Sequence, residues 1–184
     1  MLKCLSDAQA AGEPILGIIH SISGSCDAKS MTAPDREGQV LAMQKTLAHC
    51  AISPEMVQYI EAHGTGTVPG DKTEMESIAE CYSHTSRAIP LVVGSVKYNF
   101  GHCFAGAGAM ALNKVLLSFD HQVLAPTPPR GEYNTALPTA KIPARILSCR
   151  TLAVGAHDSR FAALNSFGTG GINYHVILEQ AMSL

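Results

Sequence analysis

The sequence predicts an α/β fold, and three observations support this prediction. Strand-like apolar runs alternate with helix-like stretches along most of the chain, before a strand-rich end. The run IPLVVGSV (residues 89–96) shows no polar alternation, which is typical of a strand in a sheet covered on both faces. Only 15% of the 184 residues are charged, against about 25% in typical proteins, so we expect much buried surface, some of it against a partner.

The first half of the chain is expected to hold two strands and two helices. Residues 13–25 predict a strand, because bulky isoleucines and leucine run into Gly and Ser. Residues 32–52 predict a helix, with Pro34 near its start and apolar side chains at helical spacing. A short strand over 56–64 and a helix over 70–82 follow, the helix with acidic residues early, where its dipole favours them.

The second half is expected to begin with the buried strand over 89–96. A helix rich in small residues follows over 104–119, and its composition allows close packing against its neighbours. The Pro-rich stretch over 123–143 predicts a loop. The closing strands are expected at residues 144–149, 160–168 and 172–180.

Composition and charge argue against several classes of partner. The net charge is −2 without a basic stripe or acidic tail, so we expect no nucleic-acid partner. The start of the chain does not resemble a signal peptide, and no run approaches the ~18 apolar residues of a membrane span. The six cysteines form no C-x-x-C pair, which argues against zinc-ribbon and thioredoxin classes. We expect a cytoplasmic protein with reduced thiols and no membrane partner.

Three segments share one layout, in which a strand runs into a Gly-rich turn with polar groups. They are EAHGTGTVPGD (61–71), GSVKYNFGH (94–102) and NSFGTGGIN (165–173). Strand ends in α/β folds gather ligand-binding loops, and glycines leave backbone N–H groups free to donate. None has the spacing of a P-loop or a dinucleotide site. A single Gly-rich turn predicts only a tight turn, but three, two of them with a histidine, predict a site.

His63 and His102 in these turns allow two interpretations. They could ligate zinc, but they lie 39 residues apart and only Cys103 stands at ligand spacing as a third ligand. Alternatively, two neutral imidazoles could donate hydrogen bonds to an oxygen that becomes an enolate. Cys103 beside His102 suggests a thiolate nucleophile. However, adjacent side chains at a helix start point about 100° apart, which argues against Cys103 as a nucleophile paired with His102.

At these residues the chain resembles a known family. The three segments resemble the motifs in the carboxy-terminal half of β-ketoacyl synthases, especially the ketosynthase domains of modular polyketide synthases. Residues 23–39 are similar to the segment between the family's two halves, and residues 112–129 resemble the helix and following segment after the second histidine. The resemblance therefore runs from about Leu5 to Gln180. It implies a thiolase-like fold with two α/β halves stacked as αβαβα. Residues 1–30 would end the amino-terminal half, and residues 31–184 would form the carboxy-terminal half.

The resemblance implies an enzyme that joins an acyl thioester to a malonyl-type extender with loss of CO₂. In the family, a cysteine in the amino-terminal half carries the acyl chain. The extender arrives on the phosphopantetheine arm of an acyl carrier protein, so the chain itself is expected to bind no cofactor and no metal. By resemblance, His63 and His102 support decarboxylation and stabilise the enolate, and Lys97 helps to order the site.

Four further residues match binding positions of the family. Thr65 and Thr67 match threonines that contact the pantetheine arm. Thr169, with Gly170, matches the backbone that shares in the oxyanion hole. His175, in the last predicted strand, is expected to be a packed strand residue.

The chain departs from the family pattern at three positions. Thr169 stands where the family usually has a phenylalanine that gates the acyl pocket. Phe104 stands where many polyketide members have Glu. Ala111 stands where some fatty-acid members have a Glu that pairs with the lysine, so Lys97 is expected to lack that partner.

The family's nucleophile motif does not occur in the chain. We therefore expect the cysteine to lie in an absent amino-terminal half, so that the chain is a truncation, a fragment or one piece of a split enzyme. The expected partners are that half, an acyl carrier protein and a second copy of the complete domain in a homodimer. Two alternatives stay open: a non-elongating or chain-length-factor-like module that binds or transfers acyl chains without condensation, and a stand-alone metal hydrolase using both histidines.

Overall fold

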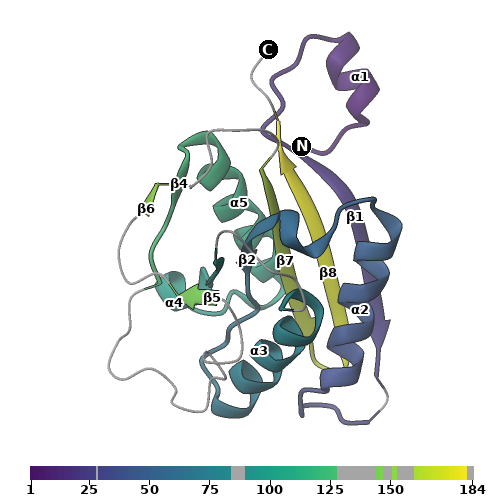
Figure 1. Cartoon of the computed structure of the whole chain (residues 1–184), viewed down its shortest axis with the longest axis vertical. Helices are drawn as coiled ribbons and strands as arrows, with labels where there is room; N and C mark the ends of the chain where they lie inside the picture. The colour runs from purple at the N-terminus through teal and green to yellow at the C-terminus, as the bar shows by residue number, and fades with distance from the viewer. Residues whose placement is uncertain (28, 84–89, 128–143, 147–150, 153–159, 182–184) are drawn as a thin grey trace.

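One mixed sheet organises the molecule (Figure 1). The computed structural model describes residues 1–27, 29–83, 90–127, 144–146, 151–152 and 160–181. Six strands pair in the order β1-β8-β7-β2-β3-β5. Their bounds are Gly17–Cys26 (β1), Val57–Glu61 (β2), Leu91–Gly94 (β3), Ala144–Ile146 (β5), Phe161–Gly168 (β7) and Ile172–Gln180 (β8).

The strand directions bring three strand ends to one edge of the sheet. β2 runs parallel to β3 on one side and to β7 on the other. β5 extends the parallel part beyond β3, whereas β8 is antiparallel to both β7 and β1. The carboxyl ends of β2, β3 and β7 therefore lie together, and each leads into one of the three Gly-rich turns.

Helices cover both faces of the sheet. α2 (Arg36–His49) and α3 (Val68–Tyr82) pack on one face, where Met43 and Ile78 join Ile60 in a buried cluster. α5 (Ala107–Asp120) packs on the other face, where Val115 joins Tyr59 in a second cluster. Successive side chains of a strand point to opposite faces. The apolar strands therefore feed two cores, as the unalternated pattern of β3 predicts.

Local chemistry sets where the two outer helices begin. Asp35 caps α2, because its Oδ2 atom accepts from the N–H of Gly38 over 2.9 Å. α3 begins at Val68 with a proline in its first turn, where a missing N–H costs no hydrogen bond. α2 is thus shorter than the predicted 32–52, and α3 starts two residues before the predicted 70–82.

Several short elements were not predicted. They are α1 (Leu5–Ala10), α4 (Lys97–Phe100), the 3-10 turn η1 (Pro54–Met56), and the pair β4 (Val123–Leu124) with β6 (Thr151–Leu152). The predicted helix over 104–119 begins as a 3-10 turn, η2 (Phe104–Gly106), before α5. The predicted loop over 123–143 is wrong at its first two residues, because two residues are too few to show strand periodicity. Residues 128–143, and the end of the predicted strand over 144–149, lie outside the described residues.

The structure tests two other predictions only in part. Within the described ranges, no helix has both the length and the apolar character needed to cross a bilayer. β1 lies in the same sheet as β8, but the division of the chain at residue 30 stays a prediction.

Candidate active site

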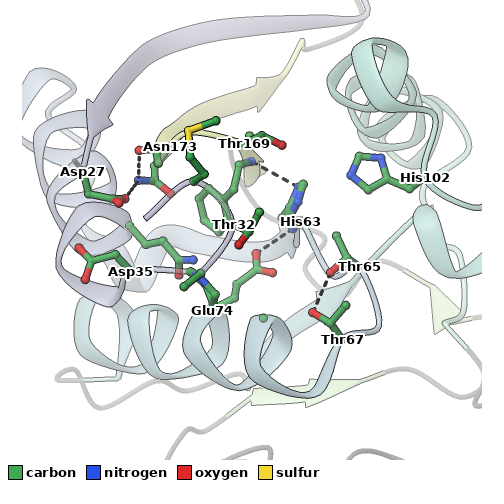
Figure 2. Close-up of a pocket in the computed structure, with 18 of the residues that line it drawn as sticks. Asp27, Thr32, Asp35, His63, Thr65, Thr67, Glu74, His102, Thr169 and Asn173 are labelled. Atoms are coloured by element: carbon green, nitrogen blue, oxygen red, sulfur yellow. Dashed lines mark hydrogen bonds between the residues drawn. The ribbon is translucent and has the colours of Figure 1, made fainter. Parts of the chain in front are cut away.

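A cleft of about 570 Å³ opens at the edge where β2, β3 and β7 end. It is lined by His63 and Thr65 after β2, by His102 after α4, and by Thr169 after β7. Figure 2 shows His63 and His102 on neighbouring walls, with Thr65 and Thr67 on the turn into α3. The three Gly-rich turns that the sequence singled out thus meet in one hollow.

Two of the predicted site residues do not line this cleft. Lys97, in the first position of α4, is buried with 7% of its surface exposed. Gly170 has a φ of +87° and donates its N–H to the carbonyl of Met31 over 2.9 Å. Neither residue is part of the cleft wall, although Gly170 lies between two residues that are, Thr169 and Gly171.

The two histidines form an edge-to-face pair. Their ring centroids lie 5.3 Å apart, with an angle of 82° between the planes. His63 Nδ1 accepts from the N–H of Phe167 over 3.3 Å, and His102 Nδ1 accepts from the N–H of Phe104 over 3.1 Å. A backbone N–H is always a donor, so each neutral ring carries its proton on Nε2. The cleft therefore holds two imidazoles of the same tautomer.

Desolvation lowers the pKa of both imidazoles. It lowers the pKa of His63 to about 3, with further contributions from the charge of Lys97 and from His102. The pKa of His102 is also lowered, first by burial and then by Lys97. At neutral pH the pair consequently consists of hydrogen-bond donors without a full charge.

Lys97 is a buried cation behind the cleft. Burial lowers the pKa of its ammonium group, although the carboxylates of Glu74 and Glu61 oppose the shift. Within the described residues, the Lys97 ammonium group forms no ion pair or hydrogen bond. Glu61 instead pairs with Lys114, whose Nζ lies 2.8 Å from its Oε2, off the line of a good hydrogen bond. Ala111 belongs to α5, is buried in the second core cluster and offers Lys97 no partner.

Glu74 is a residue of the cleft that the sequence did not single out. Its Oε1 accepts from the N–H of His63 over 2.7 Å, and its Oε2 accepts from the N–H of Gly64 over 2.8 Å. Gly64 has a φ of +40°, and a Cβ there would lie 2.8 Å from the Cβ of Ser95. The turn that carries His63 therefore needs a glycine and is held by a buried carboxylate. An acidic residue early in a helix was the only sequence signal for Glu74.

Phe104 and Thr169 form parts of the cleft wall at two of the three departures from the family pattern. The Phe104 ring stacks on His102, with centroids 5.3 Å apart and 27° between the planes. Its φ is +46°, in the left-handed region that non-glycine residues rarely adopt. An aromatic ring thus lies at the cleft beside His102, while Thr169 presents a small side chain on the β7 side.

Cys103 does not interact with the neighbouring imidazole. Its Sγ is exposed and lies 3.9 Å from the carbonyl oxygen of Gly101, and His102 Nδ1 is occupied by the Phe104 amide. Among the described residues, no group of three or more His, Cys, Asp or Glu side chains is arranged to hold a metal ion. The metal-hydrolase hypothesis thus gains no support from this part of the chain.

Comparison with known proteins identifies the family. Residues 16–129, more than half of the chain, match the model of the "Beta-ketoacyl synthase, C-terminal domain". The chain belongs to the β-ketoacyl synthase family. The thiolase-like fold that the resemblance implied is confirmed, because solved ketosynthases match nearly the whole chain.

Two polyketide synthases are similar to the chain in sequence. The chain is 35% identical to a highly reducing polyketide synthase of Hypocrea jecorina, and equally to a phenolphthiocerol/phthiocerol polyketide synthase of Mycobacterium tuberculosis. Both alignments cover all of this chain, but only 7% and 12% of those proteins.

Two solved ketosynthase domains superpose on the chain with a TM-score of 0.92. One is an oxazolomycin ketosynthase domain of Streptomyces albus, with 31% identity over 99% of this chain and 34% of its own. The other comes from module 6 of the bacillaene synthase of Bacillus subtilis, with 32% identity over 98% of this chain and 33% of its own. The chain therefore spans about a third of these solved ketosynthase chains.

Proposed function

We propose that this ketosynthase chain supplies the histidine pair for a decarboxylative Claisen condensation of an acyl thioester with a malonyl-type thioester. The observation that carries the proposal is the pair of neutral imidazoles in one cleft, each with Nε2 as its protonated nitrogen. Among the described residues, neither Nε2 has a hydrogen-bond partner. Two preorganised neutral donors suit an oxygen on which negative charge develops during the reaction.

In the proposed step, the bond between the malonyl α-carbon and its carboxylate breaks and CO₂ leaves. The electron pair of that bond forms an enolate, whose oxygen accepts hydrogen bonds from His63 and His102. The enolate carbon then attacks the carbonyl carbon of the acyl thioester, a carbon–carbon bond forms, and the cysteine thiolate leaves. The histidines stay neutral throughout, so neither has to give up a proton.

The substrates are proposed to arrive on the phosphopantetheine arm of an acyl carrier protein, with no cofactor bound by this chain. The hydroxyl groups of Thr65 and Thr67 are exposed on the cleft wall, 3.2 Å apart, and are proposed to contact the arm. The backbone around Thr169 and Gly170 is proposed to share in the oxyanion hole. Lys97 is proposed to help to order the site from behind the cleft wall.

The nucleophilic cysteine is proposed to come from the remainder of a ketosynthase domain, because this chain spans only a third of its solved relatives. The complete assembly would be an acyltransferase and a homodimer, whereas the isolated chain would be inactive. A cytoplasmic location likewise stays a prediction. The presence of both histidines in the cleft favours condensation over the non-elongating alternative.

The test is malonyl-thioester decarboxylation, measured as CO₂ release, after the remainder of a related ketosynthase domain is added to the chain. We expect activity only in the mixture, and its loss in His63→Ala and in His102→Ala. The matched control is His121→Ala, because His121 is an exposed imidazole at the end of α5. Normal decarboxylation by a protein lacking both cleft histidines would overturn the proposal.

A further inference from the structure

Behind the cleft wall, buried polar side chains form a continuous hydrogen-bonded chain that ends at the backbone of His63. We propose that Tyr82, His175 and Asn165 act through Glu74 as positioning residues for His63. The inference rests on the proposed function, because it names residues that hold one of the two proposed donors in place. It also changes the expectation for His175, which the sequence marks only as a packed strand residue.

The first member of the hydrogen-bonded chain on the side of His63 is the carboxylate of Glu74, a residue that is 3% exposed. Besides the N–H groups of His63 and Gly64, its Oε1 accepts from Asn165 Nδ2 over 2.8 Å. Three donors therefore converge on this side chain. Such convergence is what a buried carboxylate needs, because an unpaired buried acceptor is costly.

The next two links run away from the cleft and are fully buried. Asn165 Oδ1 lies 2.6 Å from His175 Nδ1, and His175 Nε2 lies 2.6 Å from the hydroxyl oxygen of Tyr82. Side chains of Asn165, His175 and Tyr82 are each 0% exposed. Burial lowers the pKa of His175 to about 3, so this imidazole is neutral and has one donor and one acceptor nitrogen.

These contacts fix the direction of every hydrogen bond in the chain. Asn165 uses its amide nitrogen to donate to Glu74, so its oxygen accepts from His175 Nδ1–H. His175 Nε2 is then an acceptor and takes the hydroxyl proton of Tyr82. Reversing any one link would place two donors or two acceptors face to face. Because all donors and acceptors are paired in only one direction, the hydrogen-bonded chain specifies a single arrangement of its side chains.

The hydrogen-bonded chain links the two contacts that place His63. The backbone of His63 is held by Glu74 on α3, and its ring is held by the N–H of Phe167 on β7. Asn165 lies two residues before Phe167 on the same strand and binds the same Glu74. The side chain of Asn165 therefore sets the offset between the two anchors, and with it the place of the imidazole in the cleft.

Amide hydrogen exchange, measured by NMR on the full chain, tests the first links. In Asn165→Ala and in Glu74→Gln, the amides of His63 and Gly64 should exchange about tenfold faster, the loss typical of one charge-assisted hydrogen bond. The amide of Ile60, in the core of β2, should keep its rate. Tyr174→Phe is the matched control, because Tyr174 is a half-exposed neighbour of His175 that is not part of the hydrogen-bonded chain. This variant should leave the exchange rates of the His63 and Gly64 amides unchanged.

Tyr82→Phe tests the far end of the chain with a variant that keeps the shape of the ring. The ¹⁵N shifts of His175 in wild type should show a protonated Nδ1 and an unprotonated Nε2. The variant should keep this tautomer, because Asn165 still accepts from Nδ1–H, but its Nε2 resonance should shift because the Tyr82 hydroxyl no longer donates to it. This measurement decides the proposal even if Asn165→Ala does not fold. A wild-type His175 protonated on Nε2, or an Nε2 shift that is unchanged in Tyr82→Phe, would overturn the assignment.

Decarboxylation, with the remainder of the domain supplied, tests the positioning role. We expect Asn165→Ala and Tyr82→Phe to lower kcat, by about a hundredfold for the Asn165 variant, with KM unchanged, as misplacement of a catalytic group does. Exchange that accelerates equally at Ile60 would indicate a merely structural role and overturn the proposal, as would local loosening with kcat unchanged. If the wild type does not decarboxylate, the proposed function fails. The hydrogen-exchange and ¹⁵N results still decide whether the hydrogen-bonded chain holds His63 in place.

Discussion

The amide N–H of Phe167 lies 3.3 Å from Nδ1 of His63, and this contact decides which nitrogen of the imidazole carries the proton. The donor is in β7 and the acceptor follows β2, so the pairing of two neighbouring parallel strands fixes a chemical property of the cleft. His102 reaches the same state by a local route, because its Nδ1 accepts from the amide two residues further on.

The first prediction concerns the titration of His63. Because burial lowers its pKa to about 3, an NMR titration should find the ring neutral from pH 8 to pH 5. The same ring in the urea-unfolded chain should titrate near its ordinary value of about 6.5. The unfolded state thus binds the proton first, so this group destabilises the fold increasingly as pH falls from about 6.5 towards 3. A folded-state pKa near 6.5 would contradict this prediction.

The second prediction concerns the backbone of Phe104. At a φ of +46° a glycine is unstrained and an alanine is not. Urea unfolding should therefore find Phe104→Gly more stable than Phe104→Ala by about 1 kcal/mol. At Ala105, whose φ is not positive, Ala105→Gly supplies the matched comparison and should lower stability. Equal or reversed stabilities of the two Phe104 variants would show that the position is not strained.

The third prediction concerns the buried pair of Glu61 and Lys114. Besides contacting Lys114, Glu61 accepts from the N–H of Val96 over 2.5 Å and so holds the turn that leads to Lys97. Lys114→Met should cost about 3–5 kcal/mol, because it leaves a buried carboxylate without its cation. The double variant Glu61→Gln/Lys114→Met should cost clearly less than the sum of the single variants. Additive losses in urea unfolding would mean that the pair is not coupled.

The fourth prediction concerns an apolar patch on the face of the sheet that carries α5. Ile22 pairs with Val176, which packs under α5, and yet Ile22 is 59% exposed. Ile172 and Tyr174 are 45% and 46% exposed on β8, at even spacing from Val176 and therefore on the same face. We expect the isolated chain to self-associate through this patch, because exposed apolar patches favour association.

Light scattering after gel filtration tests this association. Ile22→Ser with Tyr174→Ser should shift the isolated chain towards monomer. Leu41→Ser is the control, because Leu41 is 44% exposed on α2, which packs on the other face. A wild-type chain that is monomeric on its own would contradict the prediction.

The sequence predicts most of the fold and both histidines of the cleft, because these depend on local patterns. The unalternated apolar run of β3 indicated a sheet covered on both faces, and the two cores confirm it. The Gly-rich turns indicated that His63 and His102 would meet, since carboxyl ends of parallel strands share an edge. α1, α4 and the β4–β6 pair were missed because each is too short to show a period.

The links behind the cleft could not be predicted from sequence for a different reason. Asn165 lies 91 residues from Glu74, and their contact depends on the register between β2 and β7 and on the rotation of α3. Likewise, His175 and Tyr82 are 93 residues apart and belong to elements that meet only in the folded core. A histidine inside an apolar strand gives the same sequence pattern whether it merely packs or ends a hydrogen-bonded chain.

The central claim is that His63 and His102 act as neutral donors through Nε2, and replacing each with Gln and with Ala tests it most directly. A Gln side chain places an amide N–H near the position of the imidazole Nε2 but cannot transfer a proton at neutral pH. With the remainder of the domain supplied, we expect each Gln variant to decarboxylate a malonyl thioester about tenfold faster than its Ala counterpart, the effect of one hydrogen bond retained in the transition state. Gln variants as inactive as the Ala variants would contradict the claim and indicate proton transfer by the imidazoles.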